Sequence, residues 1–387
     1  DWSSDVCSSD LHLFFFGAVM KFVKTSLAVA LLSLGSLAAA ESQITLYGTV
    51  DGAVVVNKSK GADTTVSMED GIAGGSVWGL EGTEDLGNGY SVGFLLENGF
   101  SMDSGEAGEG GKSWSKQATL SVSGGFGELA FGRMGGLASY EGSYSIWDAS
   151  PIGTDYLQAG LGNVFVTGQI NNNSIVYVSP EFGGLKLHVQ YSNGTEADDK
   201  KWSLNDHYYG LGLTYELGNL SLAGIVERYD YKSFRDEDTK ASMIYSLSAS
   251  YDFEVAKVFF GYQYASRFHT VDQLEDAFVG GKGMNQNAFT LGTEIPAAGG
   301  TLKLVANYGF GKVKSTDQVT FDDNKVNLNK DKFNRFTVGA AYEYPLSKRT
   351  FLYGWGAYAT AGKLFKEKAV EGDFKSWSVG LGLHHNF

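Results

Sequence analysis

Residues 377–387 read WSVGLGLHHNF, and every second residue from Trp377 to Leu383 is large and apolar. The residues between them are small or polar, so an extended strand here has one apolar face and one face suited to water or close packing. The same alternation recurs from Ile44 to the end of the chain, with glycine-rich or polar connections between the segments. This repeated two-residue period predicts an all-β protein.

The connections between the expected strands are of two lengths. Seven are short and carry the glycine, asparagine or aspartate that tight turns need, at 86–89, 124–127, 180–184, 217–219, 252–255, 297–300 and 346–349. Eight are long and polar, near 57–74, 102–113, 134–172, 193–206, 231–240, 267–285, 312–331 and 361–375. Fifteen connections join sixteen strands, and short and long ones alternate strictly. This predicts a 16-stranded antiparallel transmembrane β-barrel with short periplasmic turns, long outer loops and a water-filled lumen.

The two faces of each expected strand follow from the alternation. Apolar side chains share one parity in segments such as 44–56, 185–191 and 336–344. Tyrosines on that parity precede short turns, as expected for an aromatic girdle at the membrane surface, although the β-propensity of tyrosine is an alternative explanation. Charged residues on the opposite parity are expected to face the lumen: Asp51, Glu81, Lys186, Lys303, Arg335 and Glu343.

The N-terminal residues divide into two segments that precede the barrel. Residues 1–19 contain SSDVCSSDL, which resembles translated sequencing-adapter read-through, and we expect them to be non-native. Residues 20–40 begin with a basic region containing Lys21 and Lys24, continue with an apolar run and end in three alanines, as a cleaved secretion signal does. The barrel domain is therefore expected to occupy residues 41–387, in the cell outer membrane.

Several functional classes are disfavoured by composition and motifs. The formal net charge of −14 argues against a nucleic-acid partner. The only cysteine, Cys7, lies in the segment expected to be non-native, so neither disulfides nor thiol chemistry are expected in the barrel. No metal-binding or phosphate-binding motif occurs, and we predict no metal, cofactor or catalytic residue.

A barrel hydrolase is the alternative from a different class. It would need a serine or paired acids beside a histidine at the outer rim. His384 and His385 are expected at the periplasmic end, and His207 and His269 are expected to be solvated near loops. His188 has inward parity and could line the lumen. We therefore predict that the chain is not an enzyme.

Six motifs together resemble the general porins of betaproteobacteria, the Neisseria-type trimeric porins. They are ITLYGTVD (44–51), WGLEGTEDLGNG (78–89), NNNSIVYVSPEFGGL (172–185), SYDFEVAKVFFGY (250–262), LSKRTFLY (346–353) and GLHHNF (382–387). The resemblance implies a homotrimer that passes small hydrophilic solutes and ions by passive diffusion. It also implies contact with outer-membrane lipids and lipopolysaccharide, and a third loop folded into the barrel. The terminal Phe387 resembles the signal read by the outer-membrane insertion machinery; the alternative is that it only belongs to the aromatic girdle.

The third long connection, 134–172, is where the resemblance implies a constriction. In the family, acids on this loop face basic residues on the opposite wall. The acids available here are Glu141, Asp148 and Asp155, each of which could instead be an ordinary solvated carboxylate.

The basic side of that constriction departs from the family pattern. Lys116 and Arg133 match basic positions of the family, but Val77, Glu81 and Val176 stand where it usually has basic residues. Fixed wall charges act strongly on ions in a narrow pore. We therefore expect weak selectivity or a preference for cations.

Aromatic residues in the third connection suggest an alternative function, a channel selective for sugars or aromatic solutes. The set could form a stacking surface or could pack the loop onto the barrel wall, and it comprises Tyr140, Tyr144, Trp147, Tyr156 and Phe165.

Overall fold

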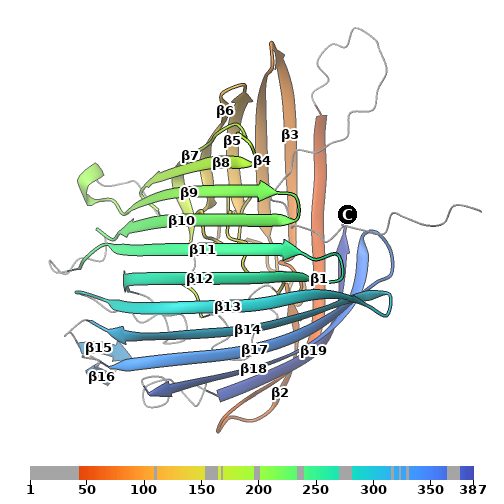
Figure 1. Ribbon diagram of the computed structural model, residues 1–387, viewed down its shortest axis with the longest axis vertical. Helices are drawn as coiled ribbons and strands as arrows, with labels where there is room; N and C mark the ends of the chain where they lie inside the picture. Colours follow the sequence, from red (N-terminus) through yellow and green to blue (C-terminus); the bar gives the residue numbers. More distant parts are fainter. Residues whose placement is uncertain are drawn as a thin grey trace, which may run out of the picture.

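The chain forms a closed antiparallel barrel of sixteen strands (Figure 1). The computed structural model describes residues 43–108, 111–152, 164–166, 169–195, 201–232, 239–269, 281–314, 318–321, 324–327, 331–363 and 375–387. The expected segments 1–19 and 20–40, together with Asp155 and Tyr156, lie outside the described residues.

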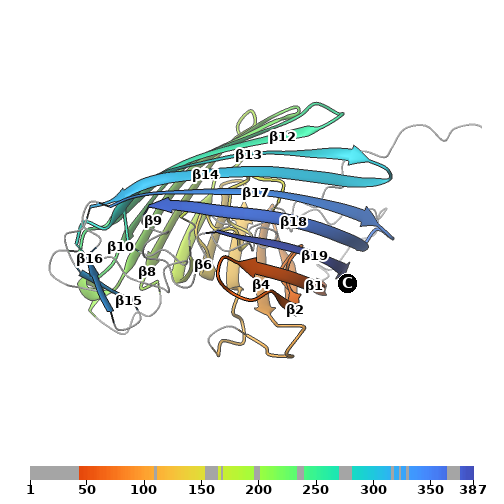
Figure 2. The same cartoon turned by 90° about the horizontal axis from the view of Figure 1, so that it is seen from below.

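Each barrel strand pairs with its neighbours in sequence, and β1 pairs with β19 to close the barrel (Figure 2). The barrel strands are β1 (Gln43–Ser59), β3 (Val77–Gly87), β4 (Tyr90–Gly99), β5 (Gln117–Gly124), β6 (Gly127–Gly135), β7 (Ile170–Val178), β8 (Leu185–Asn193), β9 (His207–Leu217), β10 (Leu220–Asp230), β11 (Ser242–Asp252), β12 (Lys257–Phe268), β13 (Met284–Ala297), β14 (Gly300–Val313), β17 (Lys332–Pro345), β18 (Thr350–Lys363) and β19 (Lys375–Asn386).

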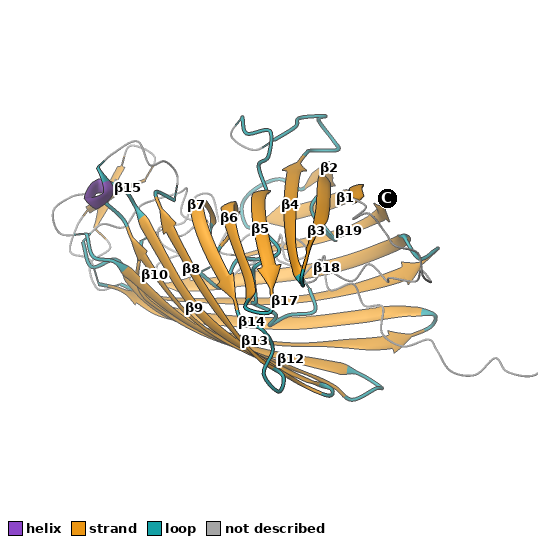
Figure 3. Cartoon of the chain, turned by 90° about the horizontal axis from the view of Figure 1, so that it is seen from above, coloured by secondary structure: helices purple, strands orange, loops and turns teal. Residues whose placement is uncertain are grey.

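Among the described residues, three further strands and one short helix lie in the long connections. β2 (Thr65–Asp70) pairs with β1, while β15 (Gln318–Phe321) and β16 (Asn324–Asn327) form a separate hairpin. The helix is a single 3₁₀ turn, Trp202–Leu204. Strands make up most of the described structure, and loops connect their ends (Figure 3). None of the helical structure in the described part of the chain is long and apolar enough to cross a membrane.

Short and long connections alternate between the barrel strands. All seven short connections join adjacent strands, such as the turn between Gly87 and Tyr90, where Asn88 has a φ of 56°. The left-handed backbone of that residue is the conformation that asparagine tolerates best after glycine. The prediction that 57–74 is a loop throughout is wrong for Thr65–Asp70, because this short polar segment extends the sheet beside β1.

The outer face of the barrel is apolar and the inner face is polar or small. In β11, Tyr245 and Leu247 are 42% and 56% exposed, whereas the alternate residues Ser246 and Ser248 are buried. The outward residues therefore present an apolar band, as a bilayer-spanning barrel requires. The predicted outward parity is confirmed in β1, where Ile44 is 67% exposed.

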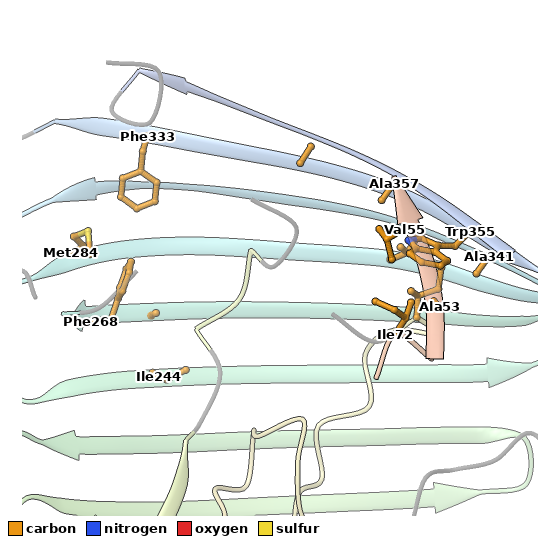
Figure 4. Packing of buried hydrophobic residues seen from close by; sticks show 14 of the residues in the cluster. Ala53, Val55, Ile72, Ile244, Phe268, Met284, Phe333, Ala341, Trp355 and Ala357 are labelled. Atoms are coloured by element: carbon orange, nitrogen blue, oxygen red, sulfur yellow. The ribbon is translucent and has the colours of Figure 1, made fainter. Parts of the chain in front are cut away.

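The buried apolar cluster drawn in Figure 4 has side chains in two places on the inner wall. Phe268, Met284 and Phe333 come from the ends of β12, β13 and β17 that border long loops. Val55 and Trp355 lie in the other place, on the wall formed by β1, β19 and β18. The lumen is therefore not uniformly polar, and segments that cover these groups shape its cross-section.

Candidate functional site

The described residues of loop 3, the connection 136–169 between β6 and β7, lie against inward-facing side chains of the barrel. At its start, the Leu137 N–H donates to Tyr208 Oη (2.8 Å) and the Ala138 N–H donates to Glu227 Oε1 (3.2 Å). The Tyr208 hydroxyl donates to the same carboxylate oxygen at 2.8 Å. Glu227 is fully buried, so one carboxylate on β10 holds the beginning of the loop against the wall.

The far part of loop 3 is held by amide and guanidinium groups of the opposite strands. Gln263 and Val166 exchange two hydrogen bonds, 2.7 Å to the Val166 N–H and 2.9 Å to its carbonyl. The Val164 carbonyl accepts from Gln286 Nε2 at 2.6 Å and from Arg335 Nη2 at 3.1 Å. Arg335 is only 3% exposed, so its charge serves to hold the loop and has little contact with lumen water.

Glycines on the inner wall allow loop 3 to lie very close. A Cβ built on Gly261 would lie 2.5 Å from the Cβ of Ala149, which real Cβ atoms do not approach. A Cβ on Gly292 would collide in the same way with Pro151. The glycines on this wall are therefore required by the close approach of Ala149 and Pro151 of the loop.

The aromatic residues of loop 3 mostly pack against the protein. Trp147 and Phe165 are nearly buried, and their ring centroids lie 5.4 Å apart in an edge-to-face arrangement. Tyr144 donates to Glu128 Oε1 at 2.7 Å. Tyr140, at 40% exposed, differs from them. These contacts favour the packing interpretation over a continuous stacking surface.

A first charged group joins loop 3 to the wall of β4 and β5. Lys116 Nζ lies 2.8 Å from Glu141 Oε1, and both side chains are partly exposed. Glu97, the inward residue paired with Gln117 in the sheet, accepts a 2.8 Å hydrogen bond from the Tyr47 hydroxyl. The lysine expected on the basic side of the constriction thus lies beside two acids, one of them on the loop itself.

A second charged group lies on β13, β14 and β17. Lys303 Nζ lies 2.8 Å from Glu343 Oε1 and 3.8 Å from Glu294 Oε1. Lys257 is the sheet neighbour of Glu294 on β12, and Asp148 of loop 3 is near enough to act electrostatically on that glutamate. Again a lysine stands between two acids, close to the place where loop 3 meets Gly292.

Two histidines differ from the sequence expectation. His207 and His269, expected to be solvated, are both buried. His207 packs among aromatic rings and contacts the Trp202 carbonyl at 2.9 Å, while His269 contacts the Lys240 carbonyl at 2.7 Å. The expectation is wrong because loop-side aromatic and backbone groups cover both rings. Within the described residues, no group of three or more potential metal-ligating side chains is found.

A family model for Gram-negative porins matches residues 26–364. The chain belongs to the Gram-negative porin family. An outer membrane porin protein of Bordetella pertussis is 32% identical over 94% of this chain and 100% of the relative. The major outer membrane protein P.IB of Neisseria meningitidis is 30% identical over 90% of this chain and 95% of the relative.

Solved structures agree with this assignment. The anion-selective porin from Comamonas acidovorans has a TM-score of 0.62 at 26% identity, with 90% of this chain and 100% of that chain covered. Family and fold together make the chain an outer-membrane protein and a porin channel, and they point away from an enzyme. The resemblance derived from the six sequence motifs is confirmed.

The remaining sequence-predicted site residues lie at different depths of the porin. Glu81, on β3, has the parity of Gly79, whose missing side chain makes room for the inward ring of Tyr47. Lys186 lies near the short-turn end, 3.5 Å from the exposed Glu181. Neither contacts loop 3 through any interaction found in the described residues.

Three other residues selected in the sequence analysis have their side chains against other parts of the protein. Arg133, opposite Ala118 in the register, donates to the Ser115 carbonyl at 2.9 Å and to Asn172 Oδ1 at 2.6 Å. Val176, at a basic position of the family, is fully buried. Asp51 has inward parity but is also fully buried, so its carboxylate meets protein groups and not lumen water.

Sequence reasoning missed Glu97, Glu227 and Glu294 as inward acids. Their parity was readable, since each belongs to an alternating strand. What the sequence could not show is which inward residues lie at the depth of loop 3. The pairing of neighbouring strands could have revealed them. Glu294, for example, is the sheet partner of Lys303, which the sequence analysis had already selected.

Proposed function

We propose that this porin is a general diffusion channel that passes small hydrophilic solutes and ions passively, with a weak preference for cations. The observation that carries this proposal is that two inward lysines, Lys116 and Lys303, lie beside acids. Lys116 lies with Glu141 near Glu97, and Lys303 lies between Glu294 and Glu343. Each lysine is at least matched by neighbouring negative charge.

The other two basic residues expected at the constriction are held by neutral protein groups. Arg335 is buried under loop 3, and Arg133 is held by Ser115 and Asn172. Glu81 adds a further inward acid on β3. A low-dielectric barrel concentrates the field of such charges on ions in the lumen, so net negative charge favours cations.

The solved relative from Comamonas acidovorans is called anion-selective, and the proposal here is the opposite preference. Selectivity depends on a few charges in a narrow lumen and not on the fold, so relatives can differ in sign. Here Val77, Glu81 and Val176 lack the positive charges that the family pattern has.

The assembly state is part of the same proposal. We infer a homotrimer in contact with outer-membrane lipids and lipopolysaccharide, delivered by a signal at residues 20–40 and inserted by machinery that reads Phe387. Residues 1–19 are taken as non-native. The exposed apolar side chains on β1 and β19, such as Leu46 and Leu381, supply an outer face suited to subunit packing.

A planar-bilayer recording tests the function directly. Refolded protein is expected to insert in triplet conductance steps. In a potassium chloride gradient, the sign of the reversal potential is expected to show that potassium permeates more readily than chloride. That potential should decline at high salt, because screening shortens the reach of the wall charges. A stable chloride preference, or a monomer that does not conduct, would overturn the proposal.

A further inference from the structure

The second barrel strand is interrupted opposite the middle of β1. β3 pairs with β1 as far as Thr49↔Val77, and β2 resumes the pairing at Gly52↔Asp70. β2 and β3 therefore lie end to end along the same edge of β1. Six residues, Gly71 to Ser76, stand opposite only two residues of β1, so the extra residues have to leave the sheet.

The extra segment, called here the 71–76 bulge, turns toward the inside of the barrel. The Ala73 N–H donates to Asp51 Oδ1 at 3.3 Å, and Asp51 has the inward parity of Ala53 and Val55. Ile72 is 1% exposed and packs in the same cluster as Val55 and Trp355 (Figure 4). These contacts belong to the inner wall, so the bulge covers that wall and occupies part of the lumen.

Asp51 holds the bulge at three points. Its carbonyl accepts from the Gly71 N–H (3.3 Å) and from Ser76 Oγ (3.2 Å), and its carboxylate binds the Ala73 N–H. The carboxylate is itself held by the Tyr353 hydroxyl at 2.7 Å and by His384 Nδ1 at 3.0 Å. Because strands β1, β18 and β19 all contribute, the bulge is fixed to the seam that closes the barrel.

One position of the bulge is open. Gly75 is exposed, and a Cβ built on it would meet no atom within 4 Å. Its φ is outside the left-handed region, so an L side chain is compatible with the backbone. Gly71, in contrast, has a φ of 74° and lies against Gly75.

We propose that the 71–76 bulge is a second element that narrows the pore, separate from loop 3, and that position 75 controls ion passage through the size and charge of its side chain. This inference rests on the proposed function, because it needs a conducting lumen. Glycine at position 75 leaves the passage wide and neutral at that point. A side chain there would project into the path of the ions.

The test places a single thiol at that position. Gly75→Cys is made in a chain that also carries Cys7→Ser, and the thiol is modified in the bilayer with cationic or anionic methanethiosulfonate reagents. Modification is expected to lower conductance by roughly a quarter, and the potassium-to-chloride permeability ratio should differ about tenfold between the two reagents. Gly125→Cys is the matched control, since its Cβ is also unobstructed but it lies in the short turn between β5 and β6.

A second variant does not depend on labelling. Deleting residues 72–75 leaves Ser76 opposite Val50 and Gly71 opposite Asp51, which restores a regular ladder. Conductance is then expected to rise by roughly a quarter. A conducting porin that is labelled at position 75 without any change, or cannot be labelled there, would overturn the inference, as would a deletion that leaves conductance unaltered. Absence of conductance in the unmodified chain would instead overturn the proposed function.

Discussion

Reversing the charge of Glu81 is the sharpest test of how wall charges set selectivity. Glu81 lies on β3, partly exposed, on the inward parity of Gly79. Glu81→Arg changes the local charge by two units without requiring any movement of the backbone. Adding Val77→Arg places a third unit four residues away, on the same face of the strand.

The size of the effect follows from Coulomb's law. A unit charge about 6 Å from a passing ion contributes about 0.7 kcal/mol in water, and screening at 0.1 M salt lowers this to about 0.4 kcal/mol. Two units therefore change the energy of each ion by about 0.8 kcal/mol, in opposite directions for potassium and chloride. The permeability ratio of potassium to chloride is expected to fall on the order of tenfold.

The assay is the reversal potential in a potassium chloride gradient, measured for both proteins under the same conditions. Glu254→Arg is the matched control, because it makes the same charge change in the short turn between β11 and β12, away from the lumen. Its permeability ratio should stay within about twofold of the unmodified protein. An unchanged ratio in Glu81→Arg would refute the reasoning and would mean that this residue lies away from the ion path.

Three other changes address different parts of the molecule. Lys116→Gln should raise the permeability ratio about threefold in the same gradient, because a positive charge between acids is lost; a fall in the ratio would contradict the assignment. Gly261→Ala places a methyl group 2.5 Å from the Cβ of Ala149, so loop 3 must shift at a cost of about 1–3 kcal/mol. Altered single-channel conductance is expected for it and not for Gly224→Ala, whose added Cβ makes only an ordinary contact on the outer face. Deleting Phe387 should lower the outer-membrane yield several-fold in fractionated cells. If insertion is unchanged, Phe387 is only a member of the aromatic girdle and not an assembly signal.

The fold was largely readable from the sequence because a barrel is built from local signals. A two-residue period marks each strand, and turns such as that around Asn88 carry residues chosen for backbone conformation. The segment Thr65–Asp70 escaped prediction, since its pairing depends on the register of β1 across a six-residue interruption. No local property of the sequence TVSMED (65–70) predicts that this segment continues the line of β3 along β1.

The candidate site was harder to predict from the sequence than the fold, for a physical reason. Parity tells which way a side chain points but not at what depth it lies or what covers it. Asp51 and Arg335 have inward parity, yet contacts from the 71–76 bulge and loop 3 bury them. Glu227 was not selected, although its buried carboxylate holds the start of the loop.

The way in which loop 3 is held sets an order of events during assembly. The Val164 carbonyl binds Gln286 and Arg335, which come 122 and 171 residues later in the chain. Loop 3 cannot reach its final position until β13 and β17 have joined the growing wall. Contacts between such distant residues form slowly, because the chain between them must first be ordered. The narrow part of the channel is therefore among the last features to be completed.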